Sequence, residues 1–137
     1  MFTLTLVFNK ETSKVLMCYH NKQNVHNFIG GKVNDCECPI AASYRELEEE
    51  TGITKDDIKL EFLQQENCAT WQGNCWSMHI MVGVLNKDVE LKEEENGLYW
   101  VEVHDEEFLQ ASGFEGDCWV YMNRAKIMLK EKGLWRI

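Results

Sequence analysis

The stretch 31–53, GKVNDCECPIAASYRELEEETGI, constrains the fold more than any other part of this chain. Pro39 suits the first turn of a helix, because its missing N–H would have no partner there. Gly52 suits the left-handed residue that commonly ends a helix. The sequence therefore predicts a helix that begins at Pro39 and ends before Gly52, preceded by a loop that starts at Gly31.

The predicted helix has an apolar side and an acidic side. At about 100° per residue, Ile40, Tyr44 and Leu47 fall on one face, which we expect to pack against the rest of the protein. Three carboxylates cluster on roughly the opposite face: Glu46, Glu49 and Glu50.

The acidic face has two interpretations. A solvated surface is the ordinary one for a glutamate-rich helix. However, Glu46 and Glu50 are like charges at i and i+4, which mildly destabilises an isolated helix. The preceding Gly30 and Gly31 also allow a ligand to approach the backbone closely. Because Mg²⁺ takes oxygen ligands and is commonly shared with substrate phosphates, the pattern favours metal-assisted phosphate chemistry.

The same stretch carries a family resemblance. It contains Gly, five residues, Glu, seven residues, and then Arg-Glu-apolar-any-Glu-Glu-any-Gly-apolar. The matching residues are Gly31, Glu37, Arg45, Glu46, Leu47, Glu49, Glu50, Gly52 and Ile53. This pattern resembles the box of the Nudix hydrolase family, and the resemblance implies an α/β/α sandwich with a mixed β-sheet.

The resemblance also implies roles for these residues. The metal ligands would be the Gly31 carbonyl and the carboxylates of Glu46, Glu49 and Glu50, binding Mg²⁺ or alternatively Mn²⁺. The general base would be Glu46, Glu49 or an acid from a later loop, for which Glu95 is the candidate. Structural roles within the motif fall to Glu37, Arg45 and Gly52.

Outside the box, the chain is similar to the MutT branch of the family. The similarity lies in residues 3–9, 14–17, 27–33 and 95–101. It implies an enzyme that hydrolyses oxidised purine nucleoside triphosphates. The substrate-binding residues implied are Asn27, Lys32, Phe114 and Asp117.

Three of these residues also have a structural interpretation. Asn27 beside two glycines could be a turn residue, Phe114 a core residue, and Asp117 the N-terminal cap of the last helix. The chain departs from the branch at His20, which replaces a Lys, and at His26, which replaces a Trp. His79 lies in an apolar strand and is predicted to be a buried side chain with satisfied hydrogen bonds.

Composition limits the possible partners and compartment. The net charge of -9 and the lack of a basic cluster argue against binding a nucleic-acid polymer. There is no apolar run of membrane-spanning length and no basic start typical of a secretory signal, so we expect a cytoplasmic protein that does not bind membranes. Six cysteines then indicate reduced thiols. We expect a monomer or a homodimer.

The chain of 137 residues is expected to form a single domain, 1–137, of class α/β (α+β). Patterns of apolar residues predict strands and helices along its length. Expected strands are 3–9, 14–20, 27–29, 58–64, 75–85 and 97–103, and expected helices are 39–51, 104–110 and 117–133.

The leading hypothesis is a Mg²⁺-dependent nucleoside triphosphate pyrophosphohydrolase that releases a nucleoside monophosphate and pyrophosphate. A second hypothesis is a Nudix hydrolase of another diphosphate, such as a dinucleoside polyphosphate, a nucleotide sugar or ADP-ribose. A third is a non-catalytic module that senses a nucleotide. The third is disfavoured because all the box glutamates are present.

Overall fold

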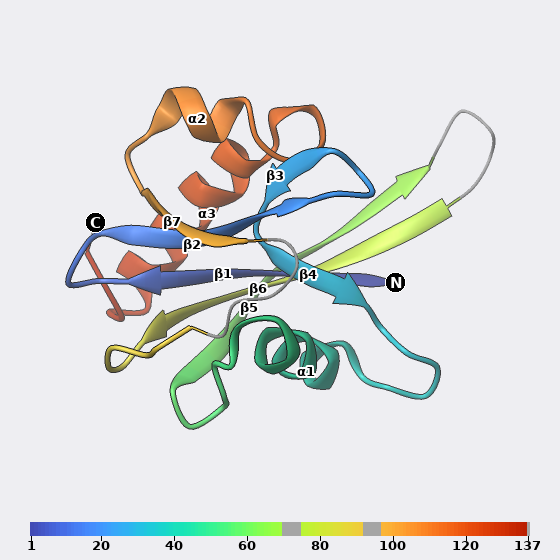
Figure 1. The fold of residues 1–137 in the computed structure, drawn as a ribbon, viewed down its shortest axis with the longest axis horizontal. Helices are drawn as coiled ribbons and strands as arrows, with labels where there is room; N and C mark the ends of the chain where they lie inside the picture. Colours follow the sequence, from blue (N-terminus) through green and yellow to red (C-terminus); the bar gives the residue numbers. More distant parts are fainter. Residues whose placement is uncertain (70–74, 92–96, 137) are drawn as a thin grey trace.

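The computed structural model describes residues 1–69, 75–91 and 97–136 (Figure 1). In chain order, the strands are β1 (Phe2–Asn9), β2 (Lys14–His20), β3 (Val25–Asn27), β4 (Ile29–Lys32), β5 (Ile58–Ala69), β6 (Cys75–Leu85) and β7 (Leu98–Glu102). The helices are α1 (Pro39–Thr51), α2 (Glu106–Gln110) and α3 (Cys118–Glu131), with a 3₁₀ turn at Phe114–Gly116.

The strands form one mixed sheet in the order β3-β2-β1-β6-β5, in which β4 also pairs with β1 and β7 with β2. Strands β1 and β6 run parallel, with Thr3 opposite His79 and Val7 opposite Gly83. The other pairings are antiparallel. The predicted class, α+β with a mixed sheet, is confirmed.

Helices cover both faces of this sheet (Figure 1). Leu6 and Phe8 of β1 belong to the core that also contains Met122 and Leu129 of α3. Val7, between them, belongs to the second core, which includes Leu47 of α1. A strand covered on both sides has apolar residues at successive positions, and for this reason β1 is buried along most of its length.

Helix α1 has the predicted bounds, and Gly52 adopts the left-handed conformation with φ 81°. The predicted division of its faces is partly wrong. Ile40 is 49% exposed, whereas Leu47 is fully buried and Glu46 is half-buried. The reason is that α1 lies against β4, where Gly31 carries no side chain, and the space above this glycine is filled by the Glu46 carboxyl group.

Two other predicted features differ in extent or role. Strand β5 continues to Ala69, beyond the predicted end at 64, with a bulge between Phe62 and Gln64. Asp117 does precede α3, but its side chain makes no capping hydrogen bond because its backbone is already helical. The prediction of a side-chain cap at Asp117 is therefore wrong.

The prediction of a hydrogen-bonded His79 is also wrong. Its ring packs against Phe62 with the centroids 4.7 Å apart. Both ring nitrogens are buried without a hydrogen-bond partner among the described residues. Burial lowers the pKa of His79, because the charged imidazolium is poorly solvated there.

Among the described residues, no helix has the length and apolar character needed to cross a membrane.

Gly83 of β6 provides a test of the packing on the α1 side of the sheet. A Cβ atom at this position would lie 2.7 Å from the Ile58 side chain and 2.9 Å from that of Leu60. Gly83→Ala should therefore lower the free energy of unfolding by about 1–3 kcal/mol, measured by urea denaturation.

Ile58→Val is the matched variant, because it removes the Cδ1 atom that the new methyl group would meet. In the Gly83→Ala background it should restore part of the lost stability, although alone it costs about 1 kcal/mol. Strictly additive effects of the two substitutions would contradict this account of the packing.

Candidate active site

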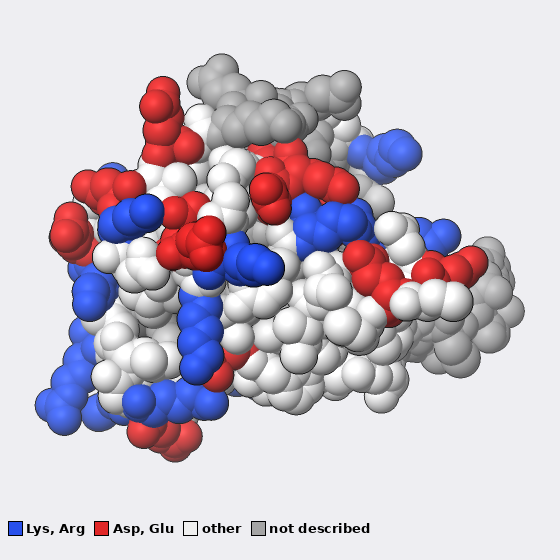
Figure 2. All heavy atoms as spheres, turned by 90° about the horizontal axis from the view of Figure 1, so that it is seen from below, with Lys and Arg blue, Asp and Glu red and all other residues white. Residues whose placement is uncertain are grey.

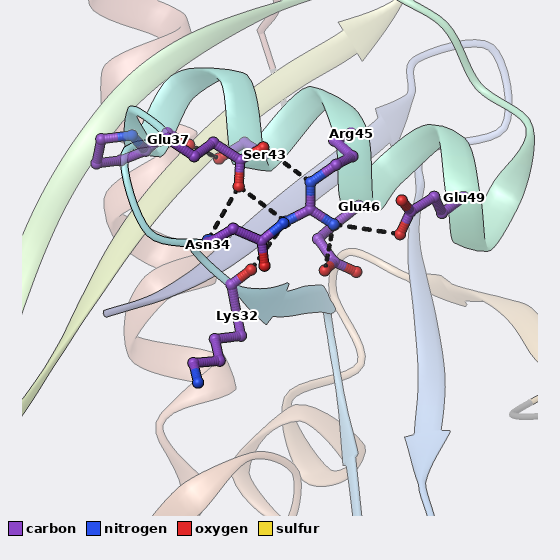
Figure 3. A network of polar contacts seen from close by, with 8 residues as sticks. Lys32, Asn34, Glu37, Ser43, Arg45, Glu46 and Glu49 are labelled. Atoms are coloured by element: carbon purple, nitrogen blue, oxygen red, sulfur yellow. Dashed lines mark hydrogen bonds and ion pairs between the residues drawn. The ribbon is translucent and has the colours of Figure 1, made fainter.

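Arg45 of α1 connects the helix to the loop between β4 and α1 (Figure 3). Its Nε donates to Glu37 Oε2 at 2.8 Å, and its Nη2 donates to Glu37 Oε1 at 2.9 Å. Nη2 also donates to the carbonyl oxygen of Lys32 at 2.9 Å. This two-point contact between a guanidinium and a carboxylate is geometrically specific, so it fixes the loop on the helix. The structural roles predicted for Glu37 and Arg45 agree with these contacts.

The pairing changes the protonation of both groups. Hydrogen bonds from Arg45, and then from the Asn34 backbone N–H, lower the pKa of Glu37 to about 2. The hydrogen bonds to Glu37 raise the pKa of Arg45 further above its already high value. Both groups therefore stay charged throughout the neutral pH range.

Glu46 lies directly over Gly31. A Cβ atom at residue 31 would overlap the Glu46 carboxyl group, so only glycine allows this contact. Arg45 Nη1 donates to Glu46 Oε1 at 2.9 Å. Burial raises the pKa of Glu46, and the contact with Arg45 opposes this effect.

The other two carboxylates of α1 have different surroundings. The Glu49 side chain is 59% exposed and contacts Arg45 Nη1 at 3.3 Å. Glu50 has one carboxyl oxygen buried and lines a large cavity. Burial, together with the nearby Glu50 charge, raises the pKa of Cys18 to about 12, so this thiol remains protonated.

The chemistry of these donors fits a hard divalent cation. The Glu46 carboxyl group packs on Gly31, and Gly31 lines the same cavity as Glu50. Oxygen donors from α1 and from β4 therefore lie close together. Among the described residues, no group of three or more acidic, His or Cys side chains is preassembled for a metal. Mg²⁺ commonly binds through one or two carboxylates together with water and substrate phosphate, and it does not need such a cage. Glu46, Glu50 and the Gly31 carbonyl would hold the ion, with Glu49 at the exposed edge.

The cavity has a volume of about 770 Å³, within the usual range for small-molecule sites. It brings together five of the residues predicted from the sequence, which come from β3, β4, α1 and the turn before α3. These residues are Asn27, Gly31, Lys32, Glu50 and Phe114. The Lys32 carbonyl is bound to Arg45, but its side chain points away from that network (Figure 3). The Lys32 ammonium group can therefore meet an anion.

Among the predicted catalytic, metal-binding and substrate-binding residues that the structure describes, Glu46, Glu49 and Asp117 do not line this cavity. Asp117 does not line it and lies close to Gly113, where a Cβ atom would overlap its carboxyl group. Glu95, the candidate acid from a later loop, falls outside the described residues.

The cavity has an aromatic wall that the sequence interpretation missed in part. The rings of Phe2 and Trp76 are 6.5 Å apart, and those of Trp76 and Phe114 are 6.4 Å apart. All three residues line the cavity, and Phe2 and Phe114 keep exposed fractions of 44% and 41%. Exposed ring faces of this kind can stack on a planar base. Trp76 and Met78 are two residues apart, so the sequence predicts that they lie on the same face of a strand. The sequence does not indicate which face of that strand meets a ligand.

His20, another missed residue, lines the cavity in a fixed orientation. Its Nε2 lies 3.0 Å from the carbonyl oxygen of Phe28 and 3.3 Å from Cys18 Sγ. A carbonyl can only accept, so Nε2 must carry the hydrogen, and Nδ1 of the neutral ring is an acceptor. His26, in contrast, does not line the cavity, and its Nδ1 is hydrogen-bonded to the hydroxyl group of Tyr99.

Comparisons with known proteins agree with this fold and motif. The NUDIX domain profile matches residues 3–120. This match spans most of the chain, and the chain belongs to the NUDIX family. The family membership predicted from the box is thereby confirmed.

Individual relatives differ in what they act on. An RNA pyrophosphohydrolase of Ectopseudomonas mendocina is 34% identical over 55 residues, which cover 40% of this chain and 35% of that protein. The chain thus spans about a third of the length of this curated relative.

Two solved structures have a similar fold. An Ap4A hydrolase of C. elegans, in a binary complex, has a TM-score of 0.71 at 15% identity, covering 98% of this chain and 100% of the other. A MutT structure, from work on Aliivibrio salmonicida and Vibrio cholerae, has a TM-score of 0.67 at 22% identity, covering 90% and 93%. At these identities, the similarity shows the fold and not the substrate.

The contact between Glu37 and Arg45 predicts a pH-dependent stability. The folded pKa of Glu37 is about 2 against an ordinary value of 4.5. The stability advantage of wild type over Glu37→Gln should therefore be full above pH 4.5 and be lost as the pH falls through about 2. Urea midpoints of both proteins across this range measure the effect.

Glu102→Gln is the control, because Glu102 forms an exposed pair with Lys14 at 4.0 Å. Exposed pairs contribute little to stability. A difference between wild type and Glu37→Gln that stays constant down to the lowest pH would contradict the proposed role of the carboxylate.

Proposed function

We propose that this protein is a divalent-cation-dependent hydrolase that cleaves a phosphoric anhydride bond of a nucleotide. The observation that carries the proposal is the single cavity in which Gly31 and Glu50 of the box meet Asn27 and Phe114. A base held near Asn27 and the aromatic wall would place its phosphates toward Lys32 and α1. Family membership supports this class of reaction.

We further propose that the substrate is a nucleoside triphosphate and that the products are a nucleoside monophosphate and pyrophosphate. The support is the similarity to MutT in residues 3–9 and 27–33, together with a cavity large enough for one nucleotide. Mg²⁺ is the proposed ion, with Mn²⁺ as the alternative, because all the box donors are oxygen atoms.

The residues of the chain have separate tasks in this mechanism. When bound, the cation would neutralise phosphate charge and lower the pKa of a water molecule. Glu46, Glu49 and Glu50 hold negative charge at the end of α1, and the Lys32 ammonium attracts the phosphates. Phe114 and Trp76 exclude water from the base. Glu46 or Glu49 is the proposed general base, with Glu95 as the acid from the later loop.

A small substrate is also consistent with the surface charge. Figure 2 shows acidic and basic side chains interspersed over the face on which α1 lies. Polymer binding usually relies on a continuous basic surface. The similarity to the Ap4A hydrolase keeps a dinucleoside polyphosphate as the second candidate.

A product-resolved panel tests the proposal. With Mg²⁺, canonical and oxidised nucleoside triphosphates, ADP-ribose, dinucleoside polyphosphates, nucleotide sugars and 5′-triphosphorylated RNA are each assayed for release of monophosphate and pyrophosphate. One nucleoside triphosphate should be cleaved best, and chelation of Mg²⁺ should abolish turnover. Cleavage of only the other substrates would contradict the triphosphate assignment, and no cleavage of any would favour a sensing module.

Substitution of single glutamates tests the assignment of the metal site. Glu50→Gln should lower kcat by about 100-fold or more, because metal affinity and charge depend on the ligand carboxylate. Glu49→Gln should act in the same direction. Glu48→Gln, an exposed neighbour on the same helix, is the control and should leave kcat unchanged. Near-full activity of Glu50→Gln would contradict the assignment.

A further inference from the structure

Two accessible cysteines, Cys36 and Cys38, lie on either side of Glu37 in the loop between β4 and α1. Of the four cysteines whose side chains the structure describes, these two are exposed, whereas Cys18 and Cys118 are buried. Burial raises the pKa of Cys18 to about 12 and raises that of Cys118 as well. Because the thiolate is the reactive form of a cysteine, the two buried thiols are inert. The two thiols of the loop are the ones that a small molecule in solution can reach.

Neither of these cysteines is the residue that its backbone position favours. Cys36 has φ 64°, which lies in the left-handed region that favours glycine. Cys38 is the N-cap of α1, a position that favours a side-chain acceptor such as that of Ser or Thr, and it makes no capping hydrogen bond. Local backbone stability therefore does not account for cysteine at either position.

A disulfide between the two cysteines is within reach of the chain. Cα atoms two residues apart are separated by at most about 7 Å, and a disulfide joins Cα atoms about 4.4–6.8 Å apart. The N–H of Glu37 donates to the carbonyl oxygen of Asn34 at 3.1 Å, so the chain already turns at Cys36. Closing the bridge therefore needs only a local bend, and the backbone of Glu37 must make it.

That bend would act on the contact that fixes the loop. The Glu37 carboxylate accepts hydrogen bonds from Arg45 Nε at 2.8 Å, from Arg45 Nη2 at 2.9 Å and from the Asn34 N–H at 3.1 Å (Figure 3). A disulfide would enclose the backbone of Glu37 in a small ring and change its torsion angles. The carboxylate would then leave Arg45, and the guanidinium that also binds Glu46 would lose its main partner.

We propose that the two cysteines form a reversible intrachain disulfide, which releases Glu37 from Arg45 and thereby lowers the activity of the site. The oxidant is a low-molecular-weight disulfide such as oxidised glutathione. One cysteine thiolate attacks a sulfur of this compound, forms a mixed disulfide and expels a thiolate. The other cysteine thiolate attacks the protein sulfur of the mixed disulfide and expels the second half. Two protein thiols are thus oxidised, the small disulfide is reduced to two thiols, and the protons of the protein thiols pass to the two expelled thiolates.

Formation of the bridge can be measured on one peptide. Residues 33–45 contain both cysteines and no Lys or Arg before Arg45, so trypsin releases both cysteines together. After treatment with oxidised glutathione and then with an alkylating agent, this peptide should carry no alkyl group and be about 2 Da lighter than the dithiol, because two hydrogens are lost. A peptide that carries alkyl groups or glutathione instead would overturn the inference.

Release of Glu37 is tested with two proteins in two redox states. In the reduced state, wild type should have a higher urea midpoint than Glu37→Gln at neutral pH, because the contact of the carboxylate with Arg45 stabilises the fold. In the oxidised state, the two midpoints should coincide, because the carboxylate no longer meets Arg45. A difference of the same size in both states would overturn the release of Glu37.

A variant without the pair tests the effect on turnover. Cys36→Gly and Cys38→Ser both suit the local backbone, so the double variant should fold and, when reduced, have the kcat/KM of wild type. Oxidised glutathione should lower the kcat/KM of wild type about tenfold or more, because small displacements of catalytic groups are costly, and dithiothreitol should restore it. The double variant should keep its activity under the same treatment. An equal loss in the double variant would assign the effect to other thiols and overturn the inference.

The effect on turnover rests on the proposed function, whereas the bridge and the release of Glu37 are measured without substrate. If no nucleotide is hydrolysed but the bridge forms and the Glu37 difference disappears, the proposed function falls and the disulfide stands. If a nucleotide is hydrolysed equally well by reduced protein and by protein shown to carry the bridge, the proposed function stands and the inference falls.

Discussion

The contact of Arg45 with Glu37 and the Lys32 carbonyl is the interaction on which the site depends. One guanidinium binds both oxygens of Glu37 and the backbone at the end of β4, while its Nη1 reaches Glu46. The loop after β4 and the helix α1 are therefore held in one register. The contact of Nη1 with Glu46 also helps to hold that carboxyl group over Gly31. The box thus includes charged residues that position Glu46, one of the proposed metal ligands.

The sheet then links this acidic site to a cavity large enough for a nucleotide. Strand β4 pairs with β1, so Gly31 lies opposite Thr3, and Phe2 opposite Lys32. The cavity extends from Gly31 and Glu50 to Asn27 and the aromatic wall. The backbone of Phe28 orients two polar side chains that line this cavity. Its N–H donates to the side chain of Asn27, and its carbonyl oxygen accepts a hydrogen bond from the ring of His20. The backbone of one buried residue thereby sets the hydrogen-bonding character of the cavity.

Local signals in the sequence were sufficient for part of this structure. The ends of α1 are predictable from Pro39 and Gly52, because each of these residues determines the backbone conformation at its own position. The bounds of β6 are predictable from its long apolar run. The exposure of Ile40 could not be predicted, because the orientation of α1 depends on the contact between Glu46 and Gly31, which lies in a different element. Likewise, Trp76 and His20 join the cavity through strand pairing, which one sequence does not specify. The missing hydrogen bonds of His79 depend on its neighbours in space, and apolar patterning gives no signal for them.

The most direct test of the central claim, that α1 and β4 form a cation site at one end of the nucleotide cavity, is a Mn²⁺ titration of ¹⁵N-labelled protein followed by NMR. Paramagnetic broadening falls steeply with distance from the ion. The account predicts that broadening is strongest at Gly31 and along residues 46–50, weaker at Asn27 and absent at the far end of α3. Broadening centred elsewhere, or a pattern unchanged by Glu50→Gln, would contradict it.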